Sequence, residues 1–149
     1  MTDDTPLSGR IEAGVHILPA RVYYEDTDFT GVVYHANYLR FMERGRSEYL
    51  RIMTAQAGGR DPGLFAVTRV EIDYKAPARI HDALTIRTRF EGLKGARLLF
   101  TQQIVRAEKL LCSSSVTAVA ITEDGRPRRP DKEEQAMWNA HQAPIAAGC

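Results

Sequence analysis

The chain has 149 residues, with 20 lysine and arginine residues against 19 aspartate and glutamate residues. This length corresponds to one domain, which buries roughly two thirds of the surface that its unfolded chain exposes. Because the charges nearly cancel, no net field attracts nucleic acid or an anionic membrane, and an anionic ligand needs a local basic cluster.

The cysteines and the N-terminal segment indicate a compartment. Cys112 lies in an apolar-rich segment and Cys149 ends the chain, so the two form neither a metal-ligand spacing nor a disulfide framework. The start MTDDTPLSGRIEAGV is acidic and broken by Pro6 and Gly9, which predicts neither a signal peptide nor a membrane span. We therefore expect a cytoplasmic protein without a metal site.

Residues 1–14, at the start of the chain, are expected to be disordered. The folded domain is predicted over residues 15–130, followed by a tail over 131–149. Residues 16–24 are rich in apolar and aromatic side chains and predict a strand, which Pro19 confines to a sheet edge or a bend.

One long amphipathic helix is predicted from Asn37 to Met53. Its apolar positions repeat at helical spacing and charged residues fill the other side. Gly45 lies inside the apolar stripe, where glycine costs about 1 kcal/mol relative to alanine. We therefore expect a sheet wrapped against the helix to cross closely at Gly45.

The second half of the chain changes to the alternation that is typical of strands. Four strands are predicted, at residues 66–74, 84–91, 97–106 and 110–122. Gly92 to Gly95 indicates a hairpin, and the last strand is apolar on both faces, so we expect it in the centre of the sheet.

A weak terminal helix is predicted over residues 131–141, with Met137 and Trp138 as its docking residues. Together these elements predict an α+β domain in which a five-stranded antiparallel sheet curls around one long helix. Two layers of this size leave the other face of the sheet partly exposed, which favours oligomerisation.

Polar residues gather between Glu25 and Asn37, and three interpretations of this loop compete. Asp26, Asp28 and Gly31 match positions one, three and six of an EF-hand loop, but position twelve is Asn37 and no helix precedes the loop. The stretch DTDFT also matches the aspartate nucleophile motif of haloacid-dehalogenase-like phosphatases. The strand–helix alternation of their parallel sheet is missing here.

The third interpretation is acyl transfer, with a carboxylate as base or nucleophile and a helix N-terminus stabilising the oxyanion. Asp28 lies a few residues before the long helix, whose first-turn N–H groups are donors for a developing negative charge. His35 and the Tyr24 hydroxyl could position water or the acyl carbonyl. An aspartate before a helix is often only a cap, and Tyr24 is equally suited to packing.

Four neighbouring charged residues are expected to have structural roles. Glu25 and Asp26 should hold the turn or pair with an arginine. Glu43 and Arg46 have the spacing of an ion pair on the helix surface.

At these residues the sequence resembles the acyl-CoA thioesterases of the 4-hydroxybenzoyl-CoA thioesterase family, which have the hotdog fold. The resemblance is closest to the branch associated with the bacterial Tol-Pal envelope system, and it covers residues 18 to 125. It rests on YYEDTD (23–28), GVVYH (31–35), Asn37-Tyr38, Glu43, Arg46, YKAPAR (74–79) and Asp82. Phe29-Thr30 departs from the small residues that are common in the family.

The resemblance implies roles for single residues. Asp28 matches the catalytic aspartate, and His35 and Tyr24 match the histidine and tyrosine proposed to assist it. The helix that begins near His35 would polarise the thioester carbonyl, and hydrolysis would give free acid and CoA. No cofactor is implied, since CoA is part of the substrate. The family also implies a homodimer with edge-to-edge sheets, commonly paired into a homotetramer, with active sites at the subunit interface.

Further residues are candidates for binding the substrate. Gly31, Val33 and Tyr34 lie in the loop motif, and Lys94 and Arg97 beside the predicted hairpin are candidates for holding the CoA phosphates. Whether Asp28 attacks the carbonyl or activates water stays open.

We therefore predict a cytoplasmic acyl-CoA thioesterase, with an acyl carrier protein as a further candidate partner. The alternative is a non-catalytic module that binds acyl-CoA or an acyl carrier protein and does not depend on Asp28. A hotdog dehydratase would place its acid and base differently on the helix and loop.

Overall fold

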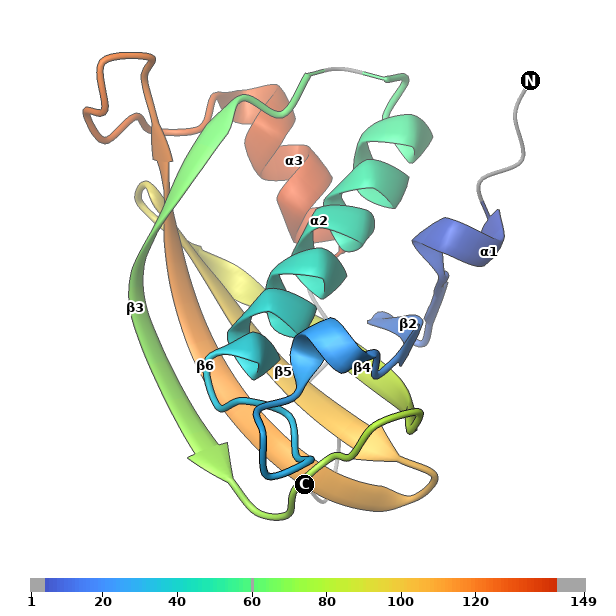
Figure 1. Cartoon of the computed structure of the whole chain (residues 1–149). Coiled ribbons are helices and arrows are strands. Elements are labelled where there is room, and N and C mark those ends of the chain that lie inside the picture. Colours follow the sequence, from blue (N-terminus) through green and yellow to red (C-terminus); the bar gives the residue numbers. More distant parts are fainter. Residues whose placement is uncertain (1–4, 60, 142–149) are drawn as a thin grey trace, which may run out of the picture.

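One sheet and one long helix make up most of the chain. The computed structural model describes residues 5–59 and 61–141. The elements in chain order are α1 (Thr5–Ser8), β1 (Arg10–Glu12), β2 (Val15–Arg21), the 3-10 helix η1 (Tyr24–Asp26), α2 (Asn37–Gln56), β3 (Leu64–Tyr74), β4 (Ala83–Lys94), β5 (Arg97–Arg106), β6 (Lys109–Ile121) and α3 (Lys132–Ala140). Figure 1 shows the sheet curling around α2, which lies against one of its faces.

The strands form a single antiparallel sheet in the order β1-β2-β4-β5-β6-β3. This confirms the predicted α+β class, an antiparallel sheet wrapped around one long helix. The last strand, β6, lies between β5 and β3, so its predicted central position is also confirmed. The sheet has six strands instead of five because β1 joins it.

The extra strand falls in the segment that was predicted to be disordered. Residues 1–4 lie outside the described residues, but residues 5–12 form α1 and β1. β1 pairs with residues 15–17 of β2, and the His16 ring nitrogen Nε2 lies 2.7 Å from the Ser8 carbonyl oxygen. A three-residue strand has too short a pattern to stand out in the sequence, and it depends on the neighbouring edge for its order.

β2 ends at Arg21, earlier than predicted. β1 pairs only with residues 15–17 of β2. At Pro19, β2 is therefore paired on one side only, with β4. Proline is tolerated at such edge positions, and the prediction that Pro19 marks an edge is confirmed. Tyr23 and Tyr24 belong to the loop that follows.

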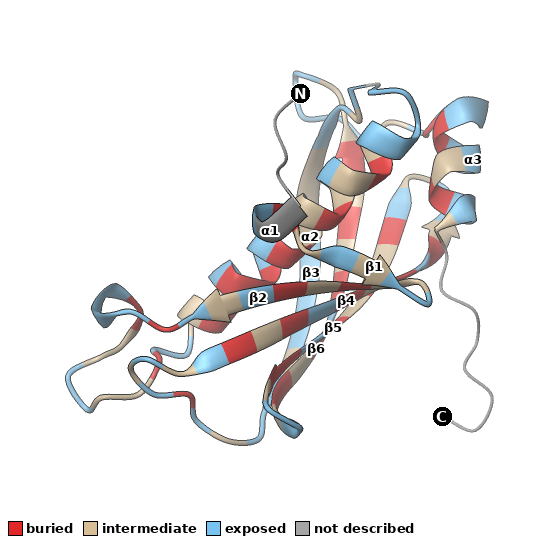
Figure 2. Cartoon of the chain, turned by 90° about the vertical axis from the view of Figure 1, so that its right-hand side faces the viewer, coloured by how far each residue is buried: buried red, intermediate tan, exposed pale blue. Residues whose placement is uncertain are grey.

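The core lies between α2 and the inner face of the sheet. Buried and exposed residues alternate along β4 and β5, and Figure 2 shows this alternation as bands along the strands. The buried side chains of one core cluster include Val22, Val33, Tyr38, Phe41, Met42, Ile86, Ile104 and Leu111. A second cluster near the C-terminal end of α2 includes Tyr49, Met53, Phe90, Leu98, Phe100 and Trp138.

The helix approaches the sheet most closely at Gly45. A Cβ atom on this residue would lie 2.8 Å from Ile86 Cγ2 and 2.9 Å from Thr88 Oγ1. The buried Gln102 amide spans the same contact, since its Nε2 donates to the Met42 carbonyl oxygen at 2.8 Å and to Thr88 Oγ1 at 2.9 Å. The predicted close crossing at Gly45 is therefore confirmed.

The expected surface pair between Glu43 and Arg46 takes a different form. The Arg46 guanidinium donates to Gln102 Oε1 at 2.8 Å, and Glu43 accepts a hydrogen bond from Ser47 at 2.6 Å. Partial burial lowers the pKa of Arg46, and the Glu43 charge acts against this shift. Arg46 thus completes the hydrogen bonding of a buried amide, which the i,i+3 spacing on the helix did not reveal.

The terminal helix α3 closes one end of the core. The Asp131 carboxylate accepts from the Glu134 amide at 2.9 Å and so caps the helix. The Trp138 ring lies 4.8 Å from that of Phe90, and Met137 is partly buried against the same cluster. The predicted docking residues are confirmed.

The crossing at Gly45 leads to a prediction about stability. Gly45→Leu should lower the free energy of unfolding by about 3 kcal/mol or more, because overpacking of a tight contact costs roughly 1–3 kcal/mol and here the backbone must also move. Chemical denaturation measures the change. Ala55→Leu, on the exposed side of the same helix, is the control and should change stability by under about 0.5 kcal/mol. Equal stability of the two variants would contradict the close crossing.

Candidate active site

The loop between β2 and α2 is held by Asp26. The buried Asp26 carboxylate accepts from the Tyr23 amide at 2.8 Å. The Asp26 carbonyl oxygen accepts from the Tyr34 amide at 3.0 Å and from the Asn37 side-chain amide at 2.8 Å. Asp26 therefore holds the turn, as expected, and closes the loop onto the first residue of α2.

Asp28 lies on the turn at the tip of this loop. Its amide donates to the Val32 carbonyl oxygen at 2.9 Å, and its carbonyl oxygen accepts from the Gly31 amide at 3.1 Å. Gly31 has φ of +85°, a conformation that favours glycine. The half-buried Asp28 side chain is thereby fixed at the tip of the turn.

The Asp28 carboxylate is ionised at neutral pH. Its Oδ1 accepts from the Thr30 hydroxyl and from the Thr30 amide, the latter at 2.8 Å. These two bonds stabilise the charged form and hold the pKa of Asp28 below its usual value of 3.8. The carboxylate is thus in the charged form that a base or a nucleophile requires, although the lowered pKa makes it a weaker base than a free aspartate.

The N-terminus of α2 has no side-chain cap. Its N-cap residue is Ala36, and the amides of Asn37 and Leu39 donate to the carbonyl oxygens of Tyr34 and Ala36. Asp28 therefore does not cap α2, and the interpretation of this residue as a simple cap is wrong. The positive end of the helix dipole remains directed at the loop without a neutralising side chain.

A second sequence motif, residues 74–82, packs against the loop. The Val33 amide donates to the Ala78 carbonyl oxygen at 2.9 Å, and the Ala78 amide donates to the Tyr38 hydroxyl at 2.9 Å. The Tyr74 hydroxyl donates to the His35 carbonyl oxygen at 2.7 Å. The two motifs are distant in the sequence but form one unit in space.

The predicted catalytic residues lie on this unit, and the structure differs from the prediction in the position of Tyr24. Tyr24 belongs to η1 instead of a strand, is largely exposed, and its ring meets the edge of His81 at 5.7 Å. The exposed His35 ring lies 4.5 Å from Tyr34 and 6.5 Å from Tyr74. In the described part of the chain, the recorded side-chain bonds of Asp28 go to Thr30, not to His35 or Tyr24.

The predicted substrate-binding residues separate into two groups. Gly31 and Tyr34 lie in the loop, whereas the Val33 side chain is buried in the core and faces away from solvent. Lys94 and Arg97 pair at the β4–β5 hairpin. The loop bonds to Asp82, just before β4, so the length of β4 separates it from Lys94, on the order of 35 Å. Within one chain, the structure does not bring Lys94 and Arg97 to the loop.

The carboxylates of the loop do not converge on a cation. Those of Asp26 and Asp28 bond to separate backbone amides, those of Tyr23 and Thr30. Among residues 5–59 and 61–141, no group of three or more His, Cys, Asp or Glu side chains is placed to hold a metal ion. This geometry offers no support for the calcium interpretation.

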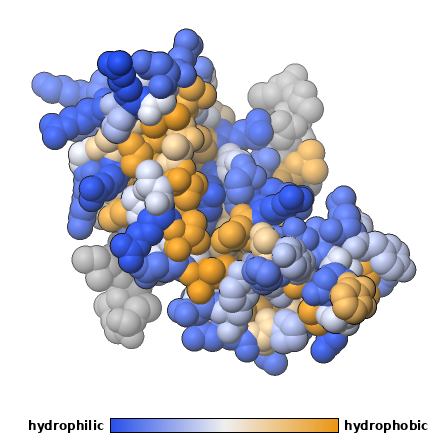
Figure 3. Space-filling model, turned by 60° about the vertical axis from the view of Figure 1, so that its left-hand side comes forward, coloured by the Kyte–Doolittle hydropathy of each residue, from blue (hydrophilic) through white to orange (hydrophobic). Residues whose placement is uncertain are grey.

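A groove of about 290 Å³ runs between α2 and the inner face of β3. Its walls are mostly apolar, and Arg46 and Glu43 lie at its polar side. Its apolar lining includes Leu50, Phe65, Leu98, Phe100 and Trp138. Exposed hydrophobic side chains continue along β3, and Figure 3 shows a band of hydrophobic atoms on this side of the molecule.

Three contacts at this site were not predicted from the sequence, namely those of the Tyr74 hydroxyl, the Tyr38 hydroxyl and the Asn37 side chain. All three residues lie in the motifs that carry the family resemblance. Their positions in the motifs therefore indicated that these residues matter to the site. Their hydrogen-bond partners are backbone groups of other segments, which no local sequence pattern indicates.

An antiparallel sheet wrapped around one long helix is the architecture of the hotdog thioesterases. Residues 22–138 match the model of the thioesterase-like superfamily, and the chain belongs to this family. The acyl-CoA thioester hydrolase YbgC of Escherichia coli O6:H1 is 44% identical over 107 residues, which are 70% of this chain and 80% of that protein. The acyl-CoA thioesterase YbgC of Haemophilus influenzae is 44% identical over 126 residues, 81% of this chain and 92% of that protein.

A solved structure agrees with these sequence relatives. The crystal structure of a probable thioesterase from Bartonella henselae is 46% identical and superposes with a TM-score of 0.70. The match covers 78% of this chain and 98% of that one. The predicted family and fold are thereby confirmed. In the described part of the chain, no helix is long and apolar enough to span a membrane.

The bond between Tyr74 and His35 leads to a prediction about the loop. Tyr74→Phe should lower the free energy of unfolding by about 1 kcal/mol, since it leaves a carbonyl without its donor. Amides of residues 33–37 should exchange with solvent faster than in the wild type, and hydrogen exchange measures this. Tyr23→Phe is the control, because the exposed Tyr23 side chain has no such contact in the described residues. Unchanged protection in Tyr74→Phe would contradict the role of this bond.

Proposed function

We propose that the chain hydrolyses acyl-CoA thioesters to free acid and CoA. The observation that carries the proposal is the ionised Asp28 carboxylate, fixed by Thr30 on an exposed turn before the uncapped N-terminus of α2. Membership of the thioesterase-like family and the activities named for the relatives support it.

The proposed reaction uses the loop and the helix together. Asp28 either attacks the thioester carbonyl carbon or removes a proton from a water molecule that attacks it. Negative charge develops on the carbonyl oxygen, where the N-terminus of α2 stabilises it. The carbon–sulfur bond then breaks, and the thiolate leaves and takes up a proton to give CoA. Where water attacks, this step gives the free acid directly. Where Asp28 attacks, it leaves an acyl-aspartate anhydride, which a water molecule then hydrolyses to the free acid and the restored Asp28 carboxylate. His35 and Tyr24 are proposed to orient the water or the acyl carbonyl.

The apolar groove beside α2 supports an acyl substrate. Its lining of aromatic and aliphatic side chains suits a hydrocarbon or aromatic acyl group. The reaction needs no metal or organic cofactor, because a thioester is an activated carbonyl and its thiolate leaves readily. The free buried Cys112 is in keeping with a reducing compartment, and we propose the cytoplasm.

The subunits are proposed to join as a homo-oligomer. β3 is one of the two edge strands of the sheet and carries exposed hydrophobic side chains, including Leu64, Val67 and Val70. Such an edge suits pairing with a second copy.

The role of Asp28 can be tested with one substitution. Asp28→Asn should reduce kcat at least about a hundredfold, because a positioned base typically contributes 10²–10⁴-fold, while the melting temperature stays unchanged. Release of CoA thiol from short, long and aromatic acyl-CoA substrates measures the activity.

Asp61→Asn is the matched control, since the Asp61 carboxylate also accepts from an amide two residues later, that of Gly63, in an exposed loop. It should leave kcat unaltered. If the wild type binds acyl-CoA or an acyl carrier protein but releases no thiol, the chain is the non-catalytic binding module instead.

The pKa of Asp28 leads to a second prediction. The lowered pKa keeps the carboxylate ionised, so kcat/KM should fall only when the pH drops through that low pKa. Thr30→Val removes the hydroxyl donor, raises the pKa of Asp28, and should move the acid limb of the pH profile to higher pH. Thr27→Val, which removes a hydroxyl that bonds to the Tyr24 carbonyl oxygen instead, should not move it. An acid limb at the same pH in both variants would exclude Asp28 as the titrating group.

A further inference from the structure

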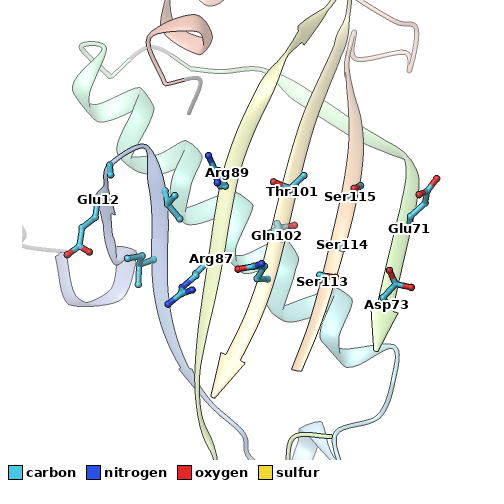
Figure 4. Close-up of a pocket in the computed structure, with 14 residues that line it drawn as sticks. Glu12, Glu71, Asp73, Arg87, Arg89, Thr101, Gln102, Ser113, Ser114 and Ser115 are labelled. Carbon is cyan, nitrogen blue, oxygen red and sulfur yellow. The ribbon is translucent and has the colours of Figure 1, made fainter. Parts of the chain in front are cut away.

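The inner face of β3 is apolar but only partly covered. Residues of β3 that lie opposite buried residues of β6 share the core side of the sheet. They are Phe65, Val67, Val70, Ile72 and Tyr74. Glu71 and Asp73, which lie between them, point to the outer face, where polar side chains line a separate hollow (Figure 4). Val67 and Tyr74 are 48% and 46% exposed, so α2 leaves this apolar surface open.

A matching stripe runs along α2. Residues that follow one another at intervals of three or four lie on one side of a helix. In α2 they include Leu39, Glu43, Arg46 and Leu50. The stripe faces the inner face of β3, because its last three members line the groove of about 290 Å³ together with residues of that strand.

The stripe and the inner face of β3 together extend from the candidate active site to the groove. At one end the Tyr74 hydroxyl bonds to the His35 carbonyl oxygen at 2.7 Å, next to the N-terminus of α2. At the other end Leu50 and Phe65 line the groove. Figure 3 shows hydrophobic atoms along this side of the molecule. We call this surface the apolar track.

Trp138 closes the far end of the track. Its buried ring lies 6.0 Å from the rings of both Phe65 and Phe100, and all three residues line the groove. The helix α3 that carries Trp138 is tied to α2, because the Tyr49 hydroxyl donates to the His141 carbonyl oxygen at 3.0 Å. The far end is therefore a fixed wall.

We propose that the apolar track holds a long, flexible acyl chain of the substrate and that Trp138 sets the length of this chain. This assignment rests on the proposed hydrolysis, which places the thioester carbonyl at the N-terminus of α2. From Asn37 to Leu50 the helix advances roughly 20 Å. An extended chain advances about 1.2 Å per bond, so an acyl chain of about 16 carbons reaches Trp138. An aryl group attached directly to the thioester carbonyl ends before the groove, so length favours the long chain.

The polar residues of the groove suit a hydrocarbon as well. Arg46 donates to Gln102, and Glu43 accepts from Ser47. Because both charged side chains have partners within the chain, neither requires a charged group of the ligand. The remaining lining is mostly apolar, and each methylene buried there should raise affinity about fourfold.

Trp138 is the single tryptophan of the chain, so its fluorescence reports directly on the end of the track. Asp28→Asn, which should bind the substrate without hydrolysing it, is titrated with acetyl-, octanoyl- and palmitoyl-CoA below the critical micelle concentration. Palmitoyl-CoA should change the emission of Trp138, whereas acetyl- and octanoyl-CoA should not, since their chains end short of it. An equal change with acetyl-CoA overturns the proposal, as does no change at any length, which would mean that protein fills the groove.

Substitutions at the far end test the same assignment through activity. Trp138→Leu lengthens the track and should raise kcat/KM for arachidoyl-CoA relative to palmitoyl-CoA about tenfold or more. Leu50→Phe fills the far end from α2, so it should lower the palmitoyl-to-octanoyl ratio about tenfold or more even if Trp138→Leu does not fold. Met137→Ala is the matched control, because Met137 packs α3 against the same cluster without lining the groove. It should keep the wild-type ratios.

The two readouts separate this assignment from the proposed hydrolysis. If the wild type releases no thiol but palmitoyl-CoA still changes the emission of Trp138, hydrolysis is wrong and the track stands as a binding site for long acyl chains. If the wild type releases thiol but folded Trp138→Leu and Leu50→Phe keep its length preference, the track is wrong and hydrolysis stands.

Discussion

The close approach of α2 to the sheet at Gly45 is the contact on which the other parts of the structure depend. With no side chain at this position, the helix backbone lies near enough for the buried Gln102 amide to bond to the Met42 carbonyl oxygen. A buried amide is costly unless its hydrogen bonds are complete, and Thr88 and Arg46 complete them. These directional bonds fix both the depth and the rotation of α2, and so decide where its N-terminus points.

The candidate site is built by a division between buried supports and exposed chemical groups. Asp26, Tyr38 and Ala78 are buried and hold the backbone of the loop, while Asp28 is half-buried and His35 is exposed. These buried residues are hydrogen-bonded to the start of α2 and to the segment before β4. The position of the loop that carries Asp28 and His35 is therefore determined by the core.

Periodicity was sufficient to predict the elements that bury a full face, α2 and the strands β3 to β6, and the energetic cost of Gly45 predicted the crossing. It failed for β1, because three residues contain no period and their order comes from β2. Motif resemblance placed Asp28 and His35 on one loop. It could not place Lys94 and Arg97 at the far end of β4, nor the bond from Tyr74 to His35, because such separations and contacts follow from the assembled sheet and not from any local pattern.

The strand order also bears on how the chain folds during synthesis. β3 is made directly after α2, but its partner in the sheet is β6, with Leu64 opposite Ile121 and Tyr74 opposite Cys112. A growing chain therefore exposes an apolar, unpaired strand until the last strand has left the ribosome, a situation that invites aggregation. Because Tyr74 ends β3, the loop that holds Asp28 acquires its final support only at that late step. The carboxylate is therefore synthesised well before β6, yet the site as a whole is completed only after β6 has emerged.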